Sequence, residues 1–118
     1  MLNFQNHIKV SVYLKPTDMR KSFDTLAALI KEIELNPLCG KYFIFYNKKR
    51  DRLKILYWDG SGYWLFCKRL EQGSFSFPDI QSNEPMVWDI DMTELTLIIE
   101  GIELKKITRK KRFKHEIT

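Results

Sequence analysis

The densest group of chemically useful side chains lies between residues 41 and 69, where cations are interleaved with aromatic rings. This stretch contains eight Lys and Arg residues and only two carboxylates, Asp51 and Asp59. Lys and Arg bind backbone phosphates, and aromatic rings stack on bases with little sequence preference. The pattern predicts a surface that binds DNA, with the candidate residues Lys48, Lys49, Arg50, Arg52, Lys54, Trp58, Tyr63, Lys68 and Arg69. The alternative is a solvated face with no binding role.

A second basic stretch forms residues 105–118, which contain seven Lys and Arg residues and one carboxylate, Glu116. Such a segment suits non-specific attachment to DNA through phosphate contacts. Its candidate residues are Arg109, Lys110, Lys111 and Arg112. A solvated, flexible tail without a fixed role is the alternative.

The motif TDMRKSFD, residues 17–24, opens an amphipathic segment. Free backbone N–H groups at a helix start attract anions, so Arg20 and Lys21 are candidates for an anion or partner contact there. The simpler interpretation is that Thr17 or Asp18 caps the helix and that Arg20 pairs with Asp24 on the surface.

Catalysis is the least favoured interpretation of these residues. A metal-dependent nuclease needs two or three carboxylates that converge on divalent ions. Five carboxylates are available near the motifs, but each has a simpler position in a cap, a turn or a strand end: Asp18, Asp24, Asp51, Asp59 and Glu71. The sequence therefore predicts a protein that is not an enzyme and uses no cofactor, with a metal-dependent nuclease as a remote alternative.

Cysteine and histidine usage predicts no metal site and a reducing compartment. Cys39 and Cys67 have no CxxC spacing and are expected to be buried thiols, while His7 and His115 lie at opposite ends of the chain. No apolar run approaches the roughly 20 residues needed to cross a bilayer. The N-terminus carries no recognisable export signal. We expect a cytoplasmic protein without membrane contact.

The segment from residue 71 to 104 is acidic, with eight carboxylates and no Lys or Arg. Blocks of one sign create local fields that attract the opposite charge. This segment could dock a basic partner or fold against the protein's own cations. The second outcome would mask the candidate DNA surface, and the sequence leaves both open.

The spacing of hydrophobic residues along the chain predicts a single α+β domain over residues 1–104, followed by the basic tail 105–118. We expect a strand at 7–15, a helix at 18–35, an antiparallel meander of strands 41–47, 52–58 and 63–70, and a helix at 92–101. Short strands are expected at 75–77 and 86–90. The first helix is expected to cover one face of the sheet.

The two turns of the meander predict which side chains share a face. One face would form the core under the helix, with Tyr57 and Trp64 turned inward: Phe43, Phe45, Leu53, Ile55, Tyr57, Trp64 and Phe66. The other would be open, with Trp58 and Tyr63 beside the cations: Tyr42, Tyr46, Arg52, Lys54, Leu56, Trp58, Tyr63, Leu65 and Arg69.

Three blocks of sequence resemble a known family: PTDMRKSFDTLAALI (16–30), DRLKILYWDGSGYWLFCKRLEQGSFSFP (51–78) and LTLIIEGIEL (95–104). They are similar, in order and spacing, to the small TnpB-type accessory protein of the insertion-sequence-sixty-six family of bacterial transposons. The resemblance implies an accessory role in DNA transposition beside a separate, larger transposase, which is the implied partner. An adaptor that assembles the transposase complex is the alternative to direct DNA binding. Residues 109–118 depart from the family pattern and receive no role from it.

Overall fold

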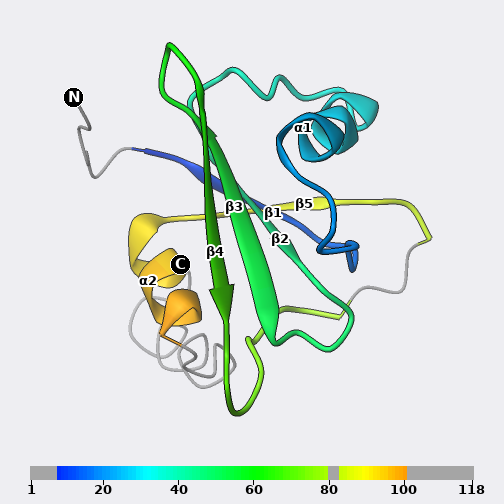
Figure 1. Cartoon of the computed structure of the whole chain (residues 1–118), viewed down its shortest axis with the longest axis vertical. Helices are drawn as coiled ribbons and strands as arrows, with labels where there is room; N and C mark the ends of the chain where they lie inside the picture. Colours follow the sequence, from blue (N-terminus) through cyan, green and yellow to red (C-terminus); the bar gives the residue numbers. More distant parts are fainter. Residues whose placement is uncertain (1–7, 80–82, 101–118) are drawn as a thin grey trace, which may run out of the picture.

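The computed structural model describes residues 8–79 and 83–100, which form five strands and two helices (Figure 1). The order along the chain is β1 (Val10–Tyr13), α1 (Phe23–Glu32), β2 (Tyr42–Tyr46), β3 (Arg52–Trp58), β4 (Tyr63–Arg69), β5 (Val87–Ile90) and α2 (Met92–Ile99). This confirms the α+β class. Within the described ranges, no helix is long and apolar enough to cross a membrane.

The five strands form one sheet in the order β4-β3-β2-β1-β5. The predicted meander is confirmed, because β2 pairs antiparallel with β3 and β3 pairs antiparallel with β4. β1 joins this meander in parallel with β2, so the sheet is mixed, which the sequence did not predict. The cause is the β1–α1–β2 connection: α1 crosses over the sheet and returns the chain to the end from which β1 started.

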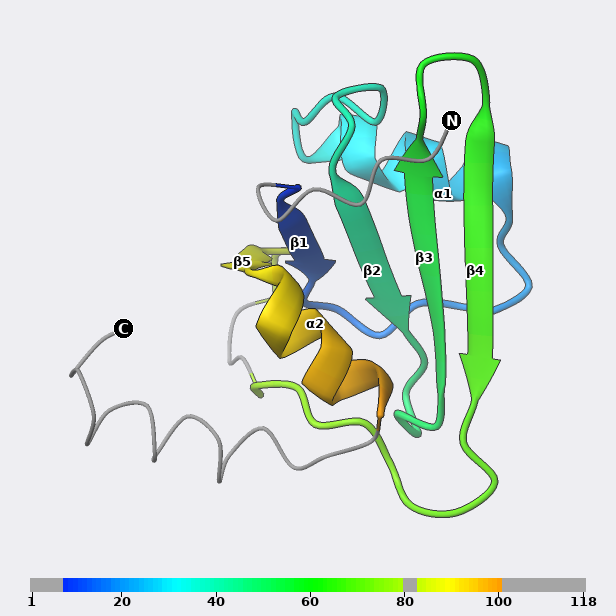
Figure 2. The same ribbon diagram turned by 90° about the vertical axis from the view of Figure 1, so that its left-hand side faces the viewer.

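The two helices cover opposite faces of the sheet, as Figure 2 shows. α1 buries Leu26, Ala27 and Ile30 against Tyr13, Phe43, Phe45 and Leu56. α2 buries Leu95 and Ile98 on the other face, where the loop after β4 adds Phe75 and Phe77. Each face of the sheet therefore carries one helix. On its own face, α2 lies over β1 and β2 and does not reach across to cover β4 (Figure 2).

The predicted faces were right for β3 and β4 and wrong for β2. Phe43 lies opposite Leu56 and Phe45 opposite Lys54, so these two rings share the face that carries Lys54. The Asn47 N–H donates to the Arg52 carbonyl at 3.2 Å, which closes a four-residue loop. Loop length fixes register, and a shift of one residue moves every side chain of a strand to the other face. α1 thus covers the face that was expected to be open.

The start of α1 also differs from the prediction. Ser22 is the N-cap, four residues after Asp18, and its N–H donates to Thr25 Oγ1 at 2.8 Å. Thr17 instead donates its hydroxyl to the Lys15 carbonyl at 3.0 Å. For α2 the sequence offered Asp91 or Thr93 as the cap, and the structure selects Asp91, because its carboxylate accepts from the Glu94 N–H at 2.8 Å.

Two smaller predictions were wrong. Cys39 and Cys67 are exposed, since one lies in the loop before β2 and the other on the outermost strand. Residues 75–77 form no strand. Phe75 and Phe77 are nevertheless buried, because the loop folds them under the sheet beside α2.

Candidate nucleic-acid interface

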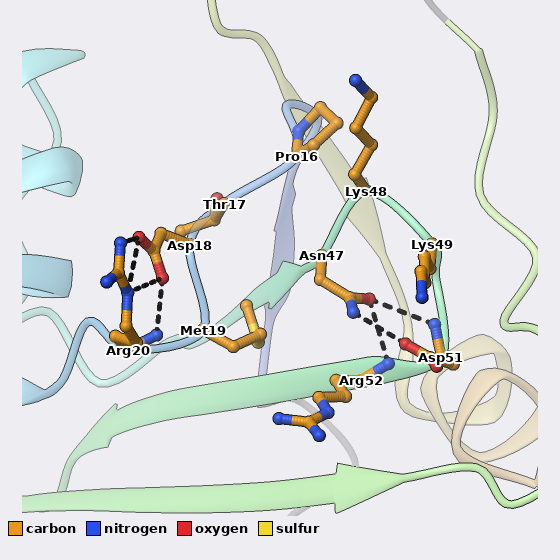
Figure 3. Close-up of a pocket in the computed structure, with 10 residues that line it drawn as sticks. All are labelled: Pro16, Thr17, Asp18, Met19, Arg20, Asn47, Lys48, Lys49, Asp51 and Arg52. Carbon is orange, nitrogen blue, oxygen red and sulfur yellow. Dashed lines mark hydrogen bonds and ion pairs between the residues drawn. The ribbon is translucent and has the colours of Figure 1, made fainter.

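An open groove lies between the β1–α1 loop and the β2–β3 hairpin (Figure 3). Its volume is about 680 Å³, and it is lined by Pro16, Thr17, Asp18, Met19, Arg20, Asn47, Lys48, Lys49, Asp51 and Arg52. The Thr17 N–H donates to the Tyr46 carbonyl at 2.8 Å and holds the two segments together. The fold thus joins two motifs, TDMRK and NKKRDR, that lie about thirty residues apart in the sequence.

A smaller hollow of about 290 Å³ shares Met19 and Arg52 with this groove. It extends along β3 and β4, and it is lined by Met19, Arg52, Leu53, Lys54, Cys67, Lys68 and Arg69. The two hollows together form what we call the basic groove, defined by the lining residues given for each. The groove runs past the start of β3 and the end of β4, where Arg52 and Arg69 lie opposite each other in the strand register.

The hairpin loop that presents the cations is fixed by one asparagine. The Asn47 Oδ1 accepts from the N–H groups of Asp51 at 3.1 Å and Arg52 at 3.0 Å. Its Nδ2 donates to Asp51 Oδ1 at 2.7 Å, and this bond lowers the pKa of Asp51. A short polar loop held at both ends keeps Lys48 and Lys49 at its tip, where both are exposed.

The opposite wall of the groove carries an ion pair between Asp18 and Arg20. The Arg20 Nη2 lies 2.6 Å from Asp18 Oδ2, and the Arg20 N–H donates to Asp18 Oδ1 at 2.8 Å. These hydrogen bonds from Arg20 hold the pKa of Asp18 far below its usual range. The expected pair with Asp24 was wrong, because these residues precede the helix rather than lie on it. Asp18 therefore compensates much of the charge of Arg20.

Three cations of the groove remain available. Lys48, Lys49 and Arg52 are exposed, and they form no ion pair with a carboxylate of the described residues. Their side chains leave the hairpin at different angles around the groove (Figure 3). Such an arrangement can contact successive phosphates of a nucleic-acid backbone.

Arg50, also a candidate, is turned away from the groove to the far side of the hairpin. Its Nη1 donates to the Phe77 carbonyl at 2.6 Å, and its Nη2 lies 2.5 Å from Asp79 Oδ1. Its guanidinium lies 5.5 Å from the centre of the Tyr46 ring. Its backbone φ of 59° is in the left-handed region, which is uncommon for a non-glycine residue. These contacts tie the hairpin to the loop that contains Phe77 and Asp79, so Arg50 serves the fold rather than the groove.

Three more candidate cations also have partners within the protein. The Lys54 Nζ donates to the Lys21 carbonyl at 2.7 Å, which ties β3 to the segment before α1. The Lys68 Nζ donates to the Ile99 carbonyl at 2.6 Å, at the end of α2 on the opposite face. Arg69 pairs with Glu71 at 3.0 Å. Lys21 is half-buried, and Lys54, Lys68 and Arg69 line the groove's extension.

The predicted interleaving of rings and cations is not realised as one surface. Trp58 and Tyr63 lie at the end of β3 and β4 opposite to Arg52 and Arg69. Six residues of strand separate Trp58 from Arg52, a distance of about 20 Å. Both rings are half-buried. Tyr63 stacks on Phe23 at the start of α1 with centroids 6.5 Å apart, and it meets Trp58 edge-on at 5.1 Å.

The exposed rings of β4 were missed by sequence reasoning. Trp64 and Phe66 were expected in the core, yet 43% and 39% of their surfaces are exposed. They stack on each other with centroids 6.0 Å apart, and the Trp64 Nε1 donates to Asp59 Oδ2 at 2.7 Å. Alternation assigned them correctly to the α2 face. The shortness of α2, which spans Met92–Ile99, was the signal that β4 would stay uncovered.

The acidic segment neutralises part of the basic one. Glu71 pairs with Arg69, and Asp79 pairs with Arg50. Asp89 accepts a hydrogen bond from Ser11 at 2.7 Å, between β5 and β1 at the other edge of the sheet. Neither ion pair involves Lys48, Lys49 or Arg52. The described carboxylates thus leave these three cations of the groove open.

Two further features concern the remaining predictions. Among residues 8–79 and 83–100, no three His, Cys, Asp or Glu side chains form a group that could hold a metal ion. The tail candidates, Arg109, Lys110, Lys111 and Arg112, lie outside the described residues.

Comparison with known proteins identifies the family of the chain. A family model described as IS66 Orf2 like protein matches residues 8–109, which include every described element. The chain belongs to the IS66 Orf2-like family. Membership implies an accessory role associated with IS66 transposition and a transposase as partner.

Two relatives of this family member come from Sinorhizobium fredii (strain NBRC 101917 / NGR234). The uncharacterized protein y4jC is 33% identical over 111 residues, which cover 93% of this chain and 92% of the relative. The uncharacterized protein y4hO is 36% identical over 104 residues, covering 87% and 88%. No solved structure matches the chain at a significant level.

Proposed function

We propose that this IS66 Orf2-like protein is a non-catalytic DNA-binding accessory of transposition that holds the DNA backbone in the basic groove. The observation that carries the proposal is the meeting of the TDMRK loop and the NKKRDR hairpin around one open groove. Lys48, Lys49 and Arg52 are its principal phosphate contacts. Arg20, whose guanidinium is exposed beside Asp18, adds a contact from the opposite wall.

The chemistry of the groove favours backbone contacts over base readout. Its available side chains are lysines and one arginine on a hairpin, and neither of the two described helices contributes a lining residue. Lysine acts as a point charge on phosphate, which supplies affinity and position but carries no sequence information. We therefore expect binding that depends steeply on salt and weakly on sequence.

The experiment is to measure affinity for a fluorescent duplex by anisotropy across a range of salt concentrations. The variant Lys48→Gln/Lys49→Gln is compared with Lys9→Gln/Lys31→Gln, which removes two exposed lysines outside the groove. Each lost phosphate contact reduces the slope of log K against log salt by about 0.9, so the groove variant should lose about 1.8. Adding Arg52→Gln should remove about 0.9 more.

Two results would remove the proposal. One is a wild-type protein that fails to bind DNA at low salt. The other is an equal loss of affinity in the groove variant and the control variant, which would indicate attraction by net charge alone. Circular dichroism on each variant verifies that the fold is retained.

A second candidate function is a protein–protein adaptor that assembles the transposase complex. The exposed, stacked pair Trp64 and Phe66 favours it, since exposed aromatic residues are enriched at protein interfaces. Co-purification with the transposase after nuclease treatment tests it. The groove variant should keep the complex and Trp64→Ala/Phe66→Ala should lose it; loss of the wild-type complex on nuclease treatment would contradict it.

A further inference from the structure

The outer edge of β4 is an unpaired strand edge in the described part of the chain. β4 pairs with β3 over all seven residues from Tyr63 to Arg69, and it ends the sheet. In Figure 2 it forms the outermost strand, with α1 behind the sheet and no described strand beyond it. A row of free backbone N–H and C=O groups is a template for pairing with another strand.

Two hydrogen bonds reveal which residues of β4 face that edge. The Asp59 N–H donates to the Gly62 carbonyl at 3.1 Å, and the Leu70 N–H donates to the Asp51 carbonyl at 2.7 Å. In an antiparallel pair, hydrogen-bonded positions alternate with non-hydrogen-bonded ones. Counting from either bond, the even-numbered residues of β4 bond to β3. The free edge therefore presents the backbone groups of Tyr63, Leu65, Cys67 and Arg69.

The opposite edge of the sheet is protected, and this one is not. β5 has only four residues and follows Pro85 closely. β4 has seven residues, no proline and an uninterrupted register with β3, and its centre Leu65–Phe66–Cys67 carries no charge. Short strands, prolines, bulges and charged side chains are the usual devices against edge pairing. Of these, β4 has only the charges of Lys68 and Arg69 at one end, so the rest of its edge is open to a partner strand.

We propose that this partner is a second copy of the chain, joined by antiparallel pairing of β4 with β4 about a two-fold axis at Phe66. In this register Leu65 bonds to Cys67 of the second copy, and Tyr63 bonds to Arg69. All four outward residues of each strand are then paired. Shifting the register by two residues in either direction leaves Tyr63 or Arg69 of each copy without a partner.

Side-chain chemistry selects the same register. The strand begins with two rings and ends with two cations, so reversing it places Tyr63 opposite Arg69 and Trp64 opposite Lys68. Cations over aromatic faces attract by about 0.5–1 kcal/mol at exposed sites. The two copies of Lys68 stay about 14 Å apart and those of Arg69 about 20 Å, beyond the screening length. Parallel pairing would instead set like charges side by side.

The first test measures the molar mass of the full chain without DNA by light scattering. A dimer has twice the 14.2 kDa of the chain. The variant Cys67→Pro removes an outward N–H, which the β3–β4 pair does not use, and it should be a monomer. Its matched control, Cys67→Val, keeps the N–H and should remain a dimer. Circular dichroism compares the fold of the two variants.

The second test fixes the register and does not depend on proline. On a Cys39→Ser/Cys67→Ser background, Phe66→Cys places two thiols at a non-hydrogen-bonded pair, where Cα atoms lie about 4.5 Å apart. That distance lies within the range of disulfides. Mild oxidation should convert this variant to a covalent dimer. Leu38→Cys, an exposed position in the loop before β2, is the control that should stay monomeric.

Three results would overturn the proposal: a monomeric wild-type chain at about 100 µM, a dimeric Cys67→Pro, or a dimer that Phe66→Cys cannot cross-link. The first two remove edge pairing, and the third removes the register. Because the mass is measured without DNA, any of them leaves the function of the basic groove to its own experiment.

Discussion

The two hairpin turns that flank β3 are both short and polar, but they use their polar groups differently. The β2–β3 turn, residues 47–51, fixes itself with Asn47 and leaves Lys48 and Lys49 exposed. In the β3–β4 turn, residues 59–62, the Asp59 carboxylate accepts from the N–H groups of Ser61 and Gly62 and from Trp64 Nε1. One turn projects charge outward, and the other uses its charge to hold itself and a neighbouring ring.

The comparison shows that the number of cations in a segment does not measure its positive surface. Arg50 and Arg52 are two residues apart, yet Arg50 is held by Phe77 and Asp79 while Arg52 is open. What separates them is the backbone of the turn: the left-handed conformation at Arg50 directs its side chain under the hairpin. Binding and structural roles alternate within one short loop.

The largest expected effect is on the free energy of unfolding, and it distinguishes Arg50 from Arg52. Arg50→Ala removes hydrogen bonds to Phe77 and Asp79, and we expect it to lower the free energy of unfolding by about 2–3 kcal/mol. Arg52→Ala should change it by less than about 0.5 kcal/mol while weakening DNA binding. Urea denaturation and anisotropy measure the two quantities. Equal stability of the two variants would break the distinction between structural and available cations.

An intermediate effect is expected within the β3–β4 turn. Gly60 has a φ of +106°, which L side chains rarely adopt, whereas Gly62 has no such conformation and open space around it. We expect Gly60→Ala to lower the free energy of unfolding by about 1–2 kcal/mol. Gly62→Ala should be close to neutral, and thermal denaturation compares the pair. A neutral Gly60→Ala would mean that this turn is not fixed as described.

The smallest effect is the pH dependence of the same turn. Hydrogen bonds from Ser61, Trp64 and Gly62 lower the pKa of Asp59 from 3.8 to about 2. A carboxyl whose pKa is lowered by folding stabilises the protein above 3.8, and this contribution is lost as the pH falls toward 2. Asp59→Asn should therefore lose less stability than wild type between pH 5 and pH 2 in urea titrations. An equal loss would contradict it.

Local signals in the sequence were sufficient for most elements. Alternation and turn residues predicted the meander within one residue at each strand end, because hairpin pairing is local in the chain. The Asp91 cap of α2 was equally readable. The parallel pairing of β1 with β2 and the cover of the second face were not, since both depend on where helices cross the sheet.

The candidate site was predicted in composition and not in arrangement. Lys48, Lys49 and Arg52 were identified by charge alone, and the fold leaves them exposed. Their meeting with the TDMRK loop could not be foreseen, because it rests on the contact between Thr17 and Tyr46. The rings Trp58 and Tyr63 were assigned to the same surface, but the length of β3 places them at its other end.

The sequence by itself determined the strands, the helices and the supply of charge, because periodicity, turn residues and caps act over a few neighbouring residues. Only the tertiary structure decided which cations face solvent and which edge of the sheet stays free. Those outcomes depend on register and on helix placement, and a one-residue shift in β2 exchanged the two faces. Contacts between residues far apart in the sequence thus bring the charged segments together to form the groove.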